Sequence, residues 1–299
     1  MKQVILLHNP GAGDEDHLKA DLIRAIEAEG YGCVYFSIKK EESWKTQIDQ
    51  ADLAVIAGGD GTVRNVLKEL LQRTVLDKKI PLAILPMGTA NNLSKTLGID
   101  NLLPHEQHIA HWKDSRLQPF DVGVLQSADS QDFFLESAGY GLFPQLIQHM
   151  DNKDTSHLEN AKDELKLALE VLYQLVQSAQ AEQYRINADG EIFEGRCILL
   201  EIMNIQSIGP NLILSPFAKT DDGVFDLVLV EEDQRDALAD YIQQLIDEKE
   251  AAFDWKTIQA KKITVDCTSQ YMHIDDELIV PFKNPILADV REKVVEFLI

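Results

Sequence analysis

The sequence predicts an α/β protein in which an N-terminal doubly wound parallel-sheet domain is followed by a mainly antiparallel β-sandwich domain. Three observations indicate this fold class. Apolar runs alternate with amphipathic runs early in the chain, glycine turns follow several of the apolar runs, and short β-like runs take over beyond about residue 118. We therefore expect residues 1–118 and 119–299 to form the two domains, and a return of the C-terminal tail to the first domain stays open.

The first domain is predicted to alternate strand and helix, which implies a parallel sheet with helices on both faces. Its predicted strands are short and uncharged, and they span residues 4–7, 33–36, 53–57 and 80–86. Apolar residues at helical spacing predict helices at 18–26 and 63–71. We expect Asp14 or Asp16 to cap the first helix and Gly30 to end it.

The second domain is predicted from short β-like runs that are separated by turn signals such as Asn187-Ala188-Asp189-Gly190. These runs span residues 120–125, 133–137, 192–202, 224–230, 263–266 and 294–298. Helical spacing of apolar residues predicts two additional helices, at 158–176 and 237–249. We expect the apolar stripe of the first of these helices to belong to the core, with a lipid entrance as the alternative.

The segment Ala57–Thr62 joins a buried strand to an amphipathic helix through a turn that contains three glycines. Free N–H groups at a helix N-terminus attract anions, and the missing Cβ atoms let a phosphate approach closely. Asp60 lies inside this turn. A carboxylate repels nearby phosphates unless a divalent cation lies between them or the carboxylate transfers a proton in the reaction. The alternative is a tight turn in which Asp60 caps the helix that follows.

Composition excludes some classes of partner. The net charge of −22 argues against a nucleic-acid partner, which needs a basic face, and against electrostatic adsorption to anionic membranes. No apolar stretch has the length of a transmembrane segment. Three widely spaced cysteines predict a reducing, cytoplasmic environment.

Further glycine and acidic motifs are spread along the chain. In order they are Asn9-Pro10-x-x-Gly13, Gly58-Gly59-Asp60-Gly61-Thr62, Pro86-x-Gly88-Thr89-x-Asn91, Phe120-Asp121-x-Gly123, Ser215-Pro216-x-Ala218, Asp222-Gly223-x-x-Asp226 and Asp275-Asp276-Glu277. Together they resemble the motifs of the diacylglycerol kinase catalytic-domain family, and most closely those of its bacterial soluble lipid kinases, which include YegS-like and sphingosine kinase-like proteins. The resemblance spans nearly the whole chain.

The resemblance implies a kinase that holds ATP between its two domains and transfers the γ-phosphate to a hydroxyl of diacylglycerol or a similar lipid, presented by a membrane or by micelles. ATP and Mg²⁺ are the implied cofactors. Glu277 is implied as the proton acceptor and Asp60 as a second catalytic group. The residues implied at the nucleotide are Asn9, Ser37, Gly58, Gly59, Asp60, Gly61, Thr62, Gly88, Thr89 and Asn91.

The resemblance also implies a structural Mg²⁺, bound by the Asp222 carboxylate and by the backbone carbonyls of Lys219 and Val224. Phosphoryl transfer depends on alignment and on neutralisation of charge, which Mg²⁺, backbone amides and nearby cations supply. Arg64 and Lys39 are candidate cations, but we expect both to be ordinary solvated charges. The oligomeric state is left open, with a homodimer as one option.

The chain departs from the family pattern at several positions. Arg64-Asn65 replaces the common Asn-Glu pair, and Asn92 stands where relatives often have Asp. The segment 204–210 lacks the usual glycine cluster. Asp276 replaces a glycine and so loses the freedom to adopt positive φ.

Two alternatives stay open. One is a kinase for a soluble alcohol, as in NAD kinases, which share the glycine-aspartate signature. The motifs at Phe120–Gly123 and Asp222–Asp226 favour a lipid acceptor over it. The other, which the departures at Arg64, 204–210 and Asp276 motivate, is a regulatory protein that binds ATP without turnover.

Overall fold

We describe the fold from a computed structural model, which covers residues 2–11, 18–73, 78–153, 158, 160–253, 255–280 and 283–299 of the chain. The chain forms two compact units, residues 1–120 with 293–299 and residues 121–292. The expected domain boundary, after residue 118, lies close to the first of these limits. Within the described residues, no helix combines the length and the apolar character that crossing a bilayer requires.

The first unit contains a parallel sheet with the strand order β17–β4–β3–β1–β2. Its strands are Gln3–His8 (β1), Gly32–Ser37 (β2), Leu53–Gly58 (β3), Leu82–Pro86 (β4) and the C-terminal end of Ile286–Leu298 (β17). Every residue of β3 and β4 is buried. This burial explains why the predicted strands are uncharged, since helices cover both faces of such a sheet.

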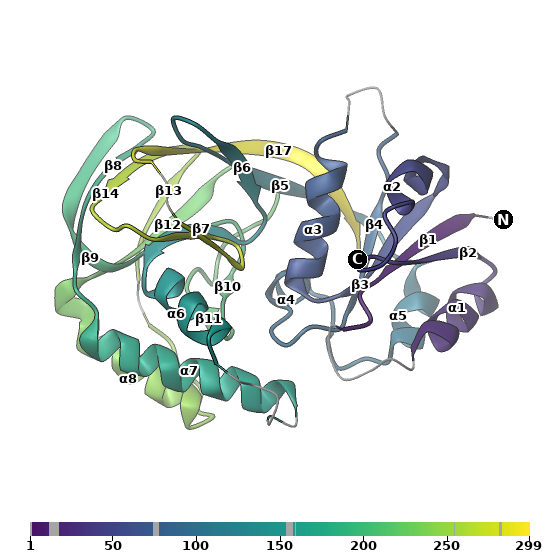
Figure 1. The fold of residues 1–299 in the computed structure, drawn as a ribbon, viewed down its shortest axis with the longest axis horizontal. Helices are drawn as coiled ribbons and strands as arrows, with labels where there is room; N and C mark the ends of the chain where they lie inside the picture. Colours follow the sequence, from purple (N-terminus) through teal and green to yellow (C-terminus); the bar gives the residue numbers. More distant parts are fainter. Residues whose placement is uncertain are drawn as a thin grey trace. The chain divides into compact units, whose positions relative to one another are not determined.

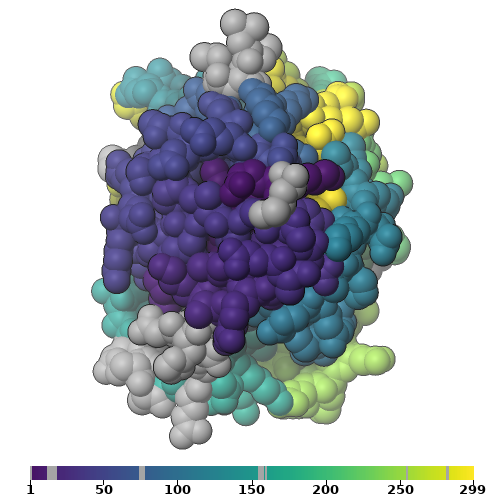
Figure 2. Space-filling view, turned by 90° about the vertical axis from the view of Figure 1, so that its right-hand side faces the viewer, coloured from purple at the N-terminus to yellow at the C-terminus, as the bar shows by residue number. Residues whose placement is uncertain are grey.

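Helices lie on both faces of this sheet. They are Leu18–Ala28 (α1), Trp44–Gln47 (α2), Asp60–Leu70 (α3), Asn92–Thr96 (α4) and His105–His111 (α5), with a short 3₁₀ helix at Ile48–Gln50. Helices α1 and α5 lie together on one face and α3 lies on the other (Figure 1). Val4 and Leu6 of β1 pack with Leu22 and Ile26 of α1 and with Ile109 of α5. On the outer surface of the unit, the early part of the chain lies beside the segment around α5 (Figure 2).

The predicted end of the first helix is confirmed. Helix α1 stops at Ala28, and Gly30 follows with φ of +83°, a conformation that favours glycine. The Gly30 N–H donates to the Glu27 carbonyl at 2.9 Å. The expected caps, Asp14 and Asp16, lie outside the described residues.

The C-terminal strand completes the core of the first unit. Phe297 is fully buried, pairs with Leu82 of β4 and packs edge-on against Phe120, with the ring centroids 5.3 Å apart. Arg116 and Ile299 exchange two backbone hydrogen bonds of 2.9 Å. The last residues of the chain are therefore part of the first unit, although they are far from it in sequence.

The second unit is built from antiparallel strands around β9, which pairs with β7, β8 and β12. The strands are Leu117–Gln126 (β5), Gln131–Phe134 (β6), Ser137–Gly141 (β7), Glu182–Ala188 (β8), Glu191–Met203 (β9), Ser207–Ile208 (β10), Leu212–Ile213 (β11), Phe225–Glu231 (β12), Lys256–Ala260 (β13), Lys262–Cys267 (β14), Met272–Ile274 (β15) and Glu277–Ile279 (β16). Both β5 and β17 carry the chain from one unit into the other.

One predicted strand is interrupted. The run 133–137 is divided between β6 and β7, because the Asp275 carboxylate accepts hydrogen bonds from the N–H groups of Leu135 and Glu136. Within the part of the chain that the structure describes, six strands were not predicted: β8, β10, β11, β13, β15 and β16. Four of them have only two or three residues, which is too short to show a period, whereas β8 shows the alternation of a half-buried strand and was missed.

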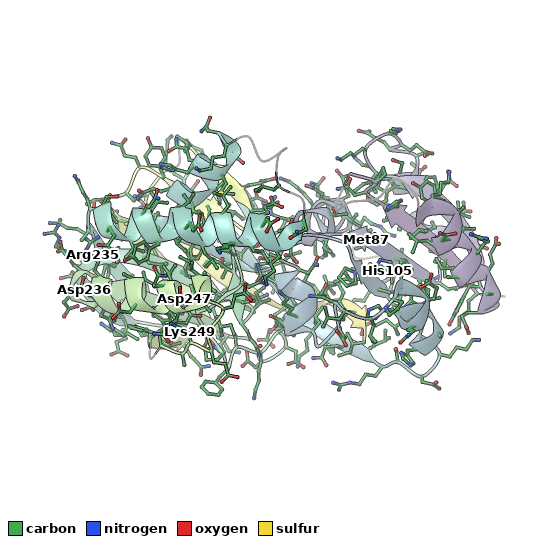
Figure 3. The ribbon with its side chains drawn as sticks, turned by 90° about the horizontal axis from the view of Figure 1, so that it is seen from below. Met87, His105, Arg235, Asp236, Asp247 and Lys249 are labelled. Atoms are coloured by element: carbon green, nitrogen blue, oxygen red, sulfur yellow. The ribbon has the colours of Figure 1, made fainter. Side chains whose placement is uncertain are left out.

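Three helices pack together in the second unit: Leu142–Asp151 (α6), Ala161–Ser178 (α7) and Arg235–Ile246 (α8). Helices α7 and α8 lie side by side (Figures 1 and 3). Arg235, labelled in Figure 3, ties the start of α8 to the end of α7 by donating to the Ala179 carbonyl at 2.7 Å and to the Val176 carbonyl. The C-terminal part of the apolar stripe of α7 belongs to the core, as predicted, with Leu172 and Val176 fully buried. Ala161, at the start of the helix, is exposed.

We predict that Phe297→Ala lowers the free energy of unfolding by about 3–5 kcal/mol, because it removes a buried ring from the core of the first unit. Denaturant unfolding measures this change. Val294 lies in the same strand but is 38% exposed, so Val294→Ala serves as the control and is expected to cost less than about 1 kcal/mol. Equal effects of the two substitutions would contradict the role of the C-terminal strand in this core.

Candidate functional site

Three loops meet at the carboxyl end of the parallel sheet in the first unit. They follow β1, β3 and β4, and parallel strands bring such loops to one edge of a sheet. Asn9, after β1, donates its backbone N–H to the Ala57 carbonyl at 3.0 Å and its side-chain amide to the Thr62 hydroxyl at 3.0 Å. Met87, after β4, donates its N–H to the Gly58 carbonyl at 3.0 Å. The structure thus brings these sequence-predicted segments together.

Two of the predicted glycines touch each other through their backbones. A Cβ atom placed on Gly59 would lie 2.8 Å from the Gly88 Cα, and a Cβ on Gly88 would collide with the Gly59 Cα. Neither collision is with a flexible side chain, so any other residue would force the two loops apart. The close approach of the second and third loops therefore requires glycine at both positions.

Asn91 holds the third loop in shape. Its side-chain oxygen accepts the Gly88 N–H at 2.9 Å, and its side-chain nitrogen donates to the Gly88 carbonyl at 2.7 Å. Asn91 has φ of +51°, a left-handed conformation that Asn tolerates better than most residues. Thr89 lies inside the loop that this clamp closes, and it is partly exposed.

Asp60 links the second loop to the helix that follows the third. Its carboxylate accepts the N–H of Asn92 at 2.9 Å and of Leu93 at 3.2 Å, the first residues of α4. The alternative that Asp60 caps its own helix is wrong, because α3 begins at Asp60 and has Gly59 at its N-cap. Asp60 satisfies the free N–H groups of another helix instead.

The N-terminus of α3 has the chemistry of an anion site. Gly59, Asp60 and Gly61 are partly exposed, and Gly58 has no room for a side chain because Thr62 would lie 2.6 Å from its Cβ. Helix N-termini carry partial positive charge and present backbone N–H donors, which suit a phosphate. Backbone N–H groups could therefore bind an anion here although the chain has a strongly negative net charge.

The end of β2 lies at the same edge. Ser37 is level with His8, the last residue of β1, and is buried. Lys39 follows in the next turn, with an exposed side chain whose ammonium lies against Gly11. Lys39 is a solvated charge, as predicted, yet it lies at the first loop. Gly13, the last residue of the first motif, lies outside the described residues.

A second cation near this edge was not predicted. Lys95 lies on α4, close enough to Asp60 for an electrostatic interaction. Neighbouring atoms partly desolvate its ammonium and lower the pKa of Lys95, while Asp60 acts in the opposite direction. The sequence could have indicated Lys95, because it follows Asn91 by four residues and so lies one helical turn beyond the third loop.

Two of the departures from the family pattern are structural in this chain. Arg64 is 2% exposed, so the expectation of a solvated charge is wrong. Asn204 is buried and donates its side-chain amide to the carbonyls of Asp121 and Leu135, each at 2.9 Å. The segment that begins at Asn204 therefore serves the packing of the second unit.

Glu277 belongs to the second unit, where it is the first residue of β16. It pairs with Ile274 of β15, and Asp275 and Asp276 form the turn of this hairpin. Asp275 has φ of +51°, whereas Asp276 is not among the residues with positive φ. The expected loss of glycine's conformational freedom at Asp276 therefore has no consequence here, because the turn places the left-handed residue one position earlier.

The implied Mg²⁺ residues lie in the turn before β12. Asp222 accepts the Val224 N–H at 3.3 Å, and Asp121 accepts the Gly223 N–H at 2.7 Å. Partial desolvation raises the pKa of Asp222, and the carboxylates of Asp226 and Asp121 raise it further. This excess of negative charge and the all-oxygen donor set fit a hard divalent cation. Among the described residues, no group of three or more His, Cys, Asp or Glu has the arrangement of a metal site.

We predict that Gly88→Ala destabilises the first unit by about 1–3 kcal/mol, because its Cβ collides with the Gly59 backbone. Thermal or denaturant unfolding measures the loss. Gly11→Ala is the control: its Cβ meets only the end of the flexible Lys39 side chain, so we expect a change within about 0.5 kcal/mol. If Gly88→Ala were as stable as Gly11→Ala, the contact between the two loops would not have the tightness described.

Comparison with known proteins gives matches to both units. The family model of the diacylglycerol kinase catalytic domain matches residues 3–125, and that of the YegS C-terminal NAD kinase β-sandwich-like domain matches residues 147–297. The diacylglycerol kinase of Bacillus subtilis (strain 168) is 25% identical over 252 residues, which cover 81% of this chain and 77% of the relative. A protein of Shewanella frigidimarina (strain NCIMB 400) named "Probable lipid kinase YegS-like" is 27% identical over 184 residues, covering 61% of this chain and 55% of the relative.

Solved structures share the fold. A diacylglycerol kinase from Bacillus anthracis str. Sterne matches with a TM-score of 0.72 at 23% identity, covering 99% of this chain and 96% of that one. An NAD kinase from Archaeoglobus fulgidus, solved in complex with ATP, matches with a TM-score of 0.54 at 14% identity, covering 99% and 93%. These matches confirm the predicted fold class, and the two family models together show that the chain is a kinase that belongs to the diacylglycerol kinase family.

Proposed function

We propose that this protein is an ATP- and Mg²⁺-dependent lipid kinase that phosphorylates a hydroxyl of diacylglycerol or a similar lipid. The observation that carries the proposal is the backbone contact between Gly59 and Gly88, which brings two glycine loops together beside the N-terminus of α3. Family membership supports the reaction type. Free cysteines at Cys33, Cys197 and Cys267 and the use of ATP favour a cytoplasmic enzyme.

The loops of the first unit would bind the triphosphate of ATP. Backbone N–H groups of Gly59, Asp60 and Gly61 are the proposed donors, since the helix dipole of α3 adds positive potential there. Asn9, Ser37, Gly58, Thr62, Gly88, Thr89 and Asn91 are proposed to shape the site around the nucleotide. Main-chain donors suit this chain, because they bind an anion without adding basic side chains.

Asp60 would act near the same phosphates. The Asp60 carboxylate already accepts two N–H groups of α4, which orient it. A carboxylate accepts further interactions through its remaining lone pairs, so Asp60 can also face the Mg²⁺ that accompanies ATP. Mg²⁺ supplies charge neutralisation of the transferring phosphoryl group when it is bound.

Glu277 of the second unit is the proposed base. The lipid hydroxyl oxygen attacks the γ-phosphorus, the bond from that phosphorus to the bridging oxygen breaks, and ADP leaves with the electron pair. The hydroxyl proton passes to the Glu277 carboxylate, so the products are a phosphorylated lipid, ADP and a protonated carboxyl group.

We predict that Glu277→Gln lowers kcat on the order of a hundredfold or more, because an amide cannot take the proton. Transfer of the labelled γ-phosphate to diacylglycerol in detergent micelles, and to a total lipid extract, measures the rate. Glu191→Gln makes the same change at an exposed carboxylate at the start of β9 and serves as the control, with little expected effect. Equal turnover by Glu277→Gln and the wild type would remove Glu277 as the base.

The phosphate-transfer assay, together with unfolding measurements, separates the alternative functions. Incorporation of phosphate into a dinucleotide acceptor, with none into lipid, would identify a soluble-alcohol kinase. Stabilisation by ATP and Mg²⁺ without transfer to any acceptor would identify a nucleotide-binding protein that does not turn over.

We further propose a structural Mg²⁺ at Asp222, with the carbonyls of Lys219 and Val224, and predict that Mg²⁺ alone stabilises the protein. At a concentration of about 100 times the Kd, binding adds about 2.7 kcal/mol to the free energy of unfolding. Denaturant unfolding in Mg²⁺ and in EDTA measures the difference, which Asp222→Asn should abolish. Asp221→Asn makes the same change of charge at the preceding residue and should leave the Mg²⁺ effect intact. If Asp222→Asn kept the full effect, the cation would bind elsewhere.

A further inference from the structure

A buried acid–base pair joins the hairpin that carries Glu277 to strand β9. Glu201 of β9 and His273 of β15 have side chains that are 0% and 1% exposed. The His273 Nε2 atom lies 3.0 Å from Oε1 and 2.9 Å from Oε2 of Glu201. Two ionisable side chains in full burial are costly unless each satisfies the other, so this pair is a built feature of the fold.

Strand β7 separates the two residues, and a glycine makes room for their contact. Gly139 pairs with Glu201 on one side and with His273 on the other, so all three lie at one level of the sheet. A Cβ atom on Gly139 would collide with the Glu201 carboxylate. The missing side chain at Gly139 therefore lets Glu201 reach His273 across the intervening strand.

The other nitrogen of His273 binds the turn before Glu277. Nδ1 lies 2.8 Å from the carbonyl oxygen of Asp275, and a carbonyl only accepts, so Nδ1 carries the proton and donates. Nε2 and the Glu201 carboxylate then share one further proton. Whether the imidazole or the carboxyl group carries it, the hydrogen bond between them is kept.

The pKa values of both Glu201 and His273 are raised above their ordinary values, which favours keeping the shared proton. Burial raises the pKa of Glu201 above its ordinary value of 4.5, and His273 opposes this only in part. Burial alone would lower the pKa of His273, but the Glu201 carboxylate outweighs it, with help from Asp275, and raises the pKa above 6.5. The ring of Phe143 packs against the imidazole, with centroids 5.9 Å apart.

Asp275 is bound through every polar group it has. Its carboxylate accepts the N–H groups of Leu135, Glu136 and Ser137 at 2.8–3.2 Å. Its own N–H donates to the Ser137 carbonyl at 2.8 Å, and its carbonyl accepts from His273. The donation from His273 is the bond that holds the Asp275 carbonyl, in addition to the bonds that the carboxylate and the N–H of Asp275 make with residues 135–137.

We propose that Glu201 and His273 are positioning residues, which fix the Asp275 carbonyl and thereby set the direction in which β16 presents Glu277. This inference rests on the proposed function, because it takes Glu277 as the base. Neither residue touches a reacting atom. Their effect on the reaction passes through the turn at Asp275 and Asp276.

Two double variants isolate the bond to the turn. Glu201→Leu with His273→Leu replaces both polar partners by apolar residues and leaves no buried unpaired charge, a change that proteins often tolerate. Glu201→Leu with His273→Asn also lacks the acid–base pair, but its side-chain amide restores a donor near the Asp275 carbonyl. The two variants therefore differ only at residue 273, where Asn offers an amide group and Leu offers no polar atom.

We expect the Leu/Leu variant to lower kcat on the order of tenfold to a hundredfold, since small displacements of a catalytic group have effects of this size. The KM for ATP should not change, because the nucleotide loops belong to the other unit. The Leu/Asn variant should recover most of kcat. In a Glu277→Gln background, Leu/Leu should cause no further loss, because the pair acts through Glu277.

Hydrogen exchange of the amides of residues 274–279 gives a readout that needs no activity. Exchange should be faster in Leu/Leu than in Leu/Asn and the wild type. Should the wild type transfer no phosphate, the proposed function fails, and this comparison alone decides whether the pair fixes the turn.

Several results would overturn the proposal. They are a folded Leu/Leu variant with wild-type kcat and exchange, a full additional loss of kcat in the Glu277→Gln background, or a Leu/Asn variant no better than Leu/Leu. Glu201→Gln supplies a second test, because its amide still donates to Nε2 of a neutral His273. We expect near-normal kcat from it, and a large loss in that folded variant would also contradict a positioning role.

Discussion

The contact between the backbones of Gly59 and Gly88 is the constraint on which the candidate nucleotide site depends. Two loops from neighbouring parallel strands can approach this closely only where both residues lack a Cβ atom. Once they do, Asp60 of the second loop reaches the first N–H groups of α4, and Asn91 closes the third loop on Gly88. The donors at the start of α3 and the loop around Thr89 are thereby held at one edge of the sheet.

This arrangement would let a chain of net charge −22 bind the polyanion that we propose as its ligand. Main-chain N–H groups and a helix dipole supply positive potential without basic side chains. Two cations lie near this edge: the Lys39 ammonium lies against Gly11 of the first loop, and Lys95 lies on α4. Acidic character and phosphate chemistry are therefore compatible in one protein, provided that Mg²⁺ accompanies the nucleotide.

Much of the fold could be predicted from the sequence, because continuous apolar runs such as 53–57 mark buried strands and glycine turns mark their ends. The glycines and Asn9 could be predicted as neighbours for the same reason. The burial of Arg64 could not be predicted, because the spacing of apolar residues describes the faces of a single helix and does not show which other elements pack against that helix. The Glu201–His273 pair was also beyond prediction, because its partners lie 72 residues apart and meet only through the register of three strands.

Hydrogen exchange of the wild-type protein with and without ATP and Mg²⁺ tests most directly whether main-chain donors of the first unit bind the triphosphate. The account predicts that ATP with Mg²⁺ slows exchange of the amides in residues 58–63 and 87–93, and that adenosine does not. Unchanged exchange in both segments at a saturating concentration of ATP, or protection confined to other parts of the chain, would contradict it.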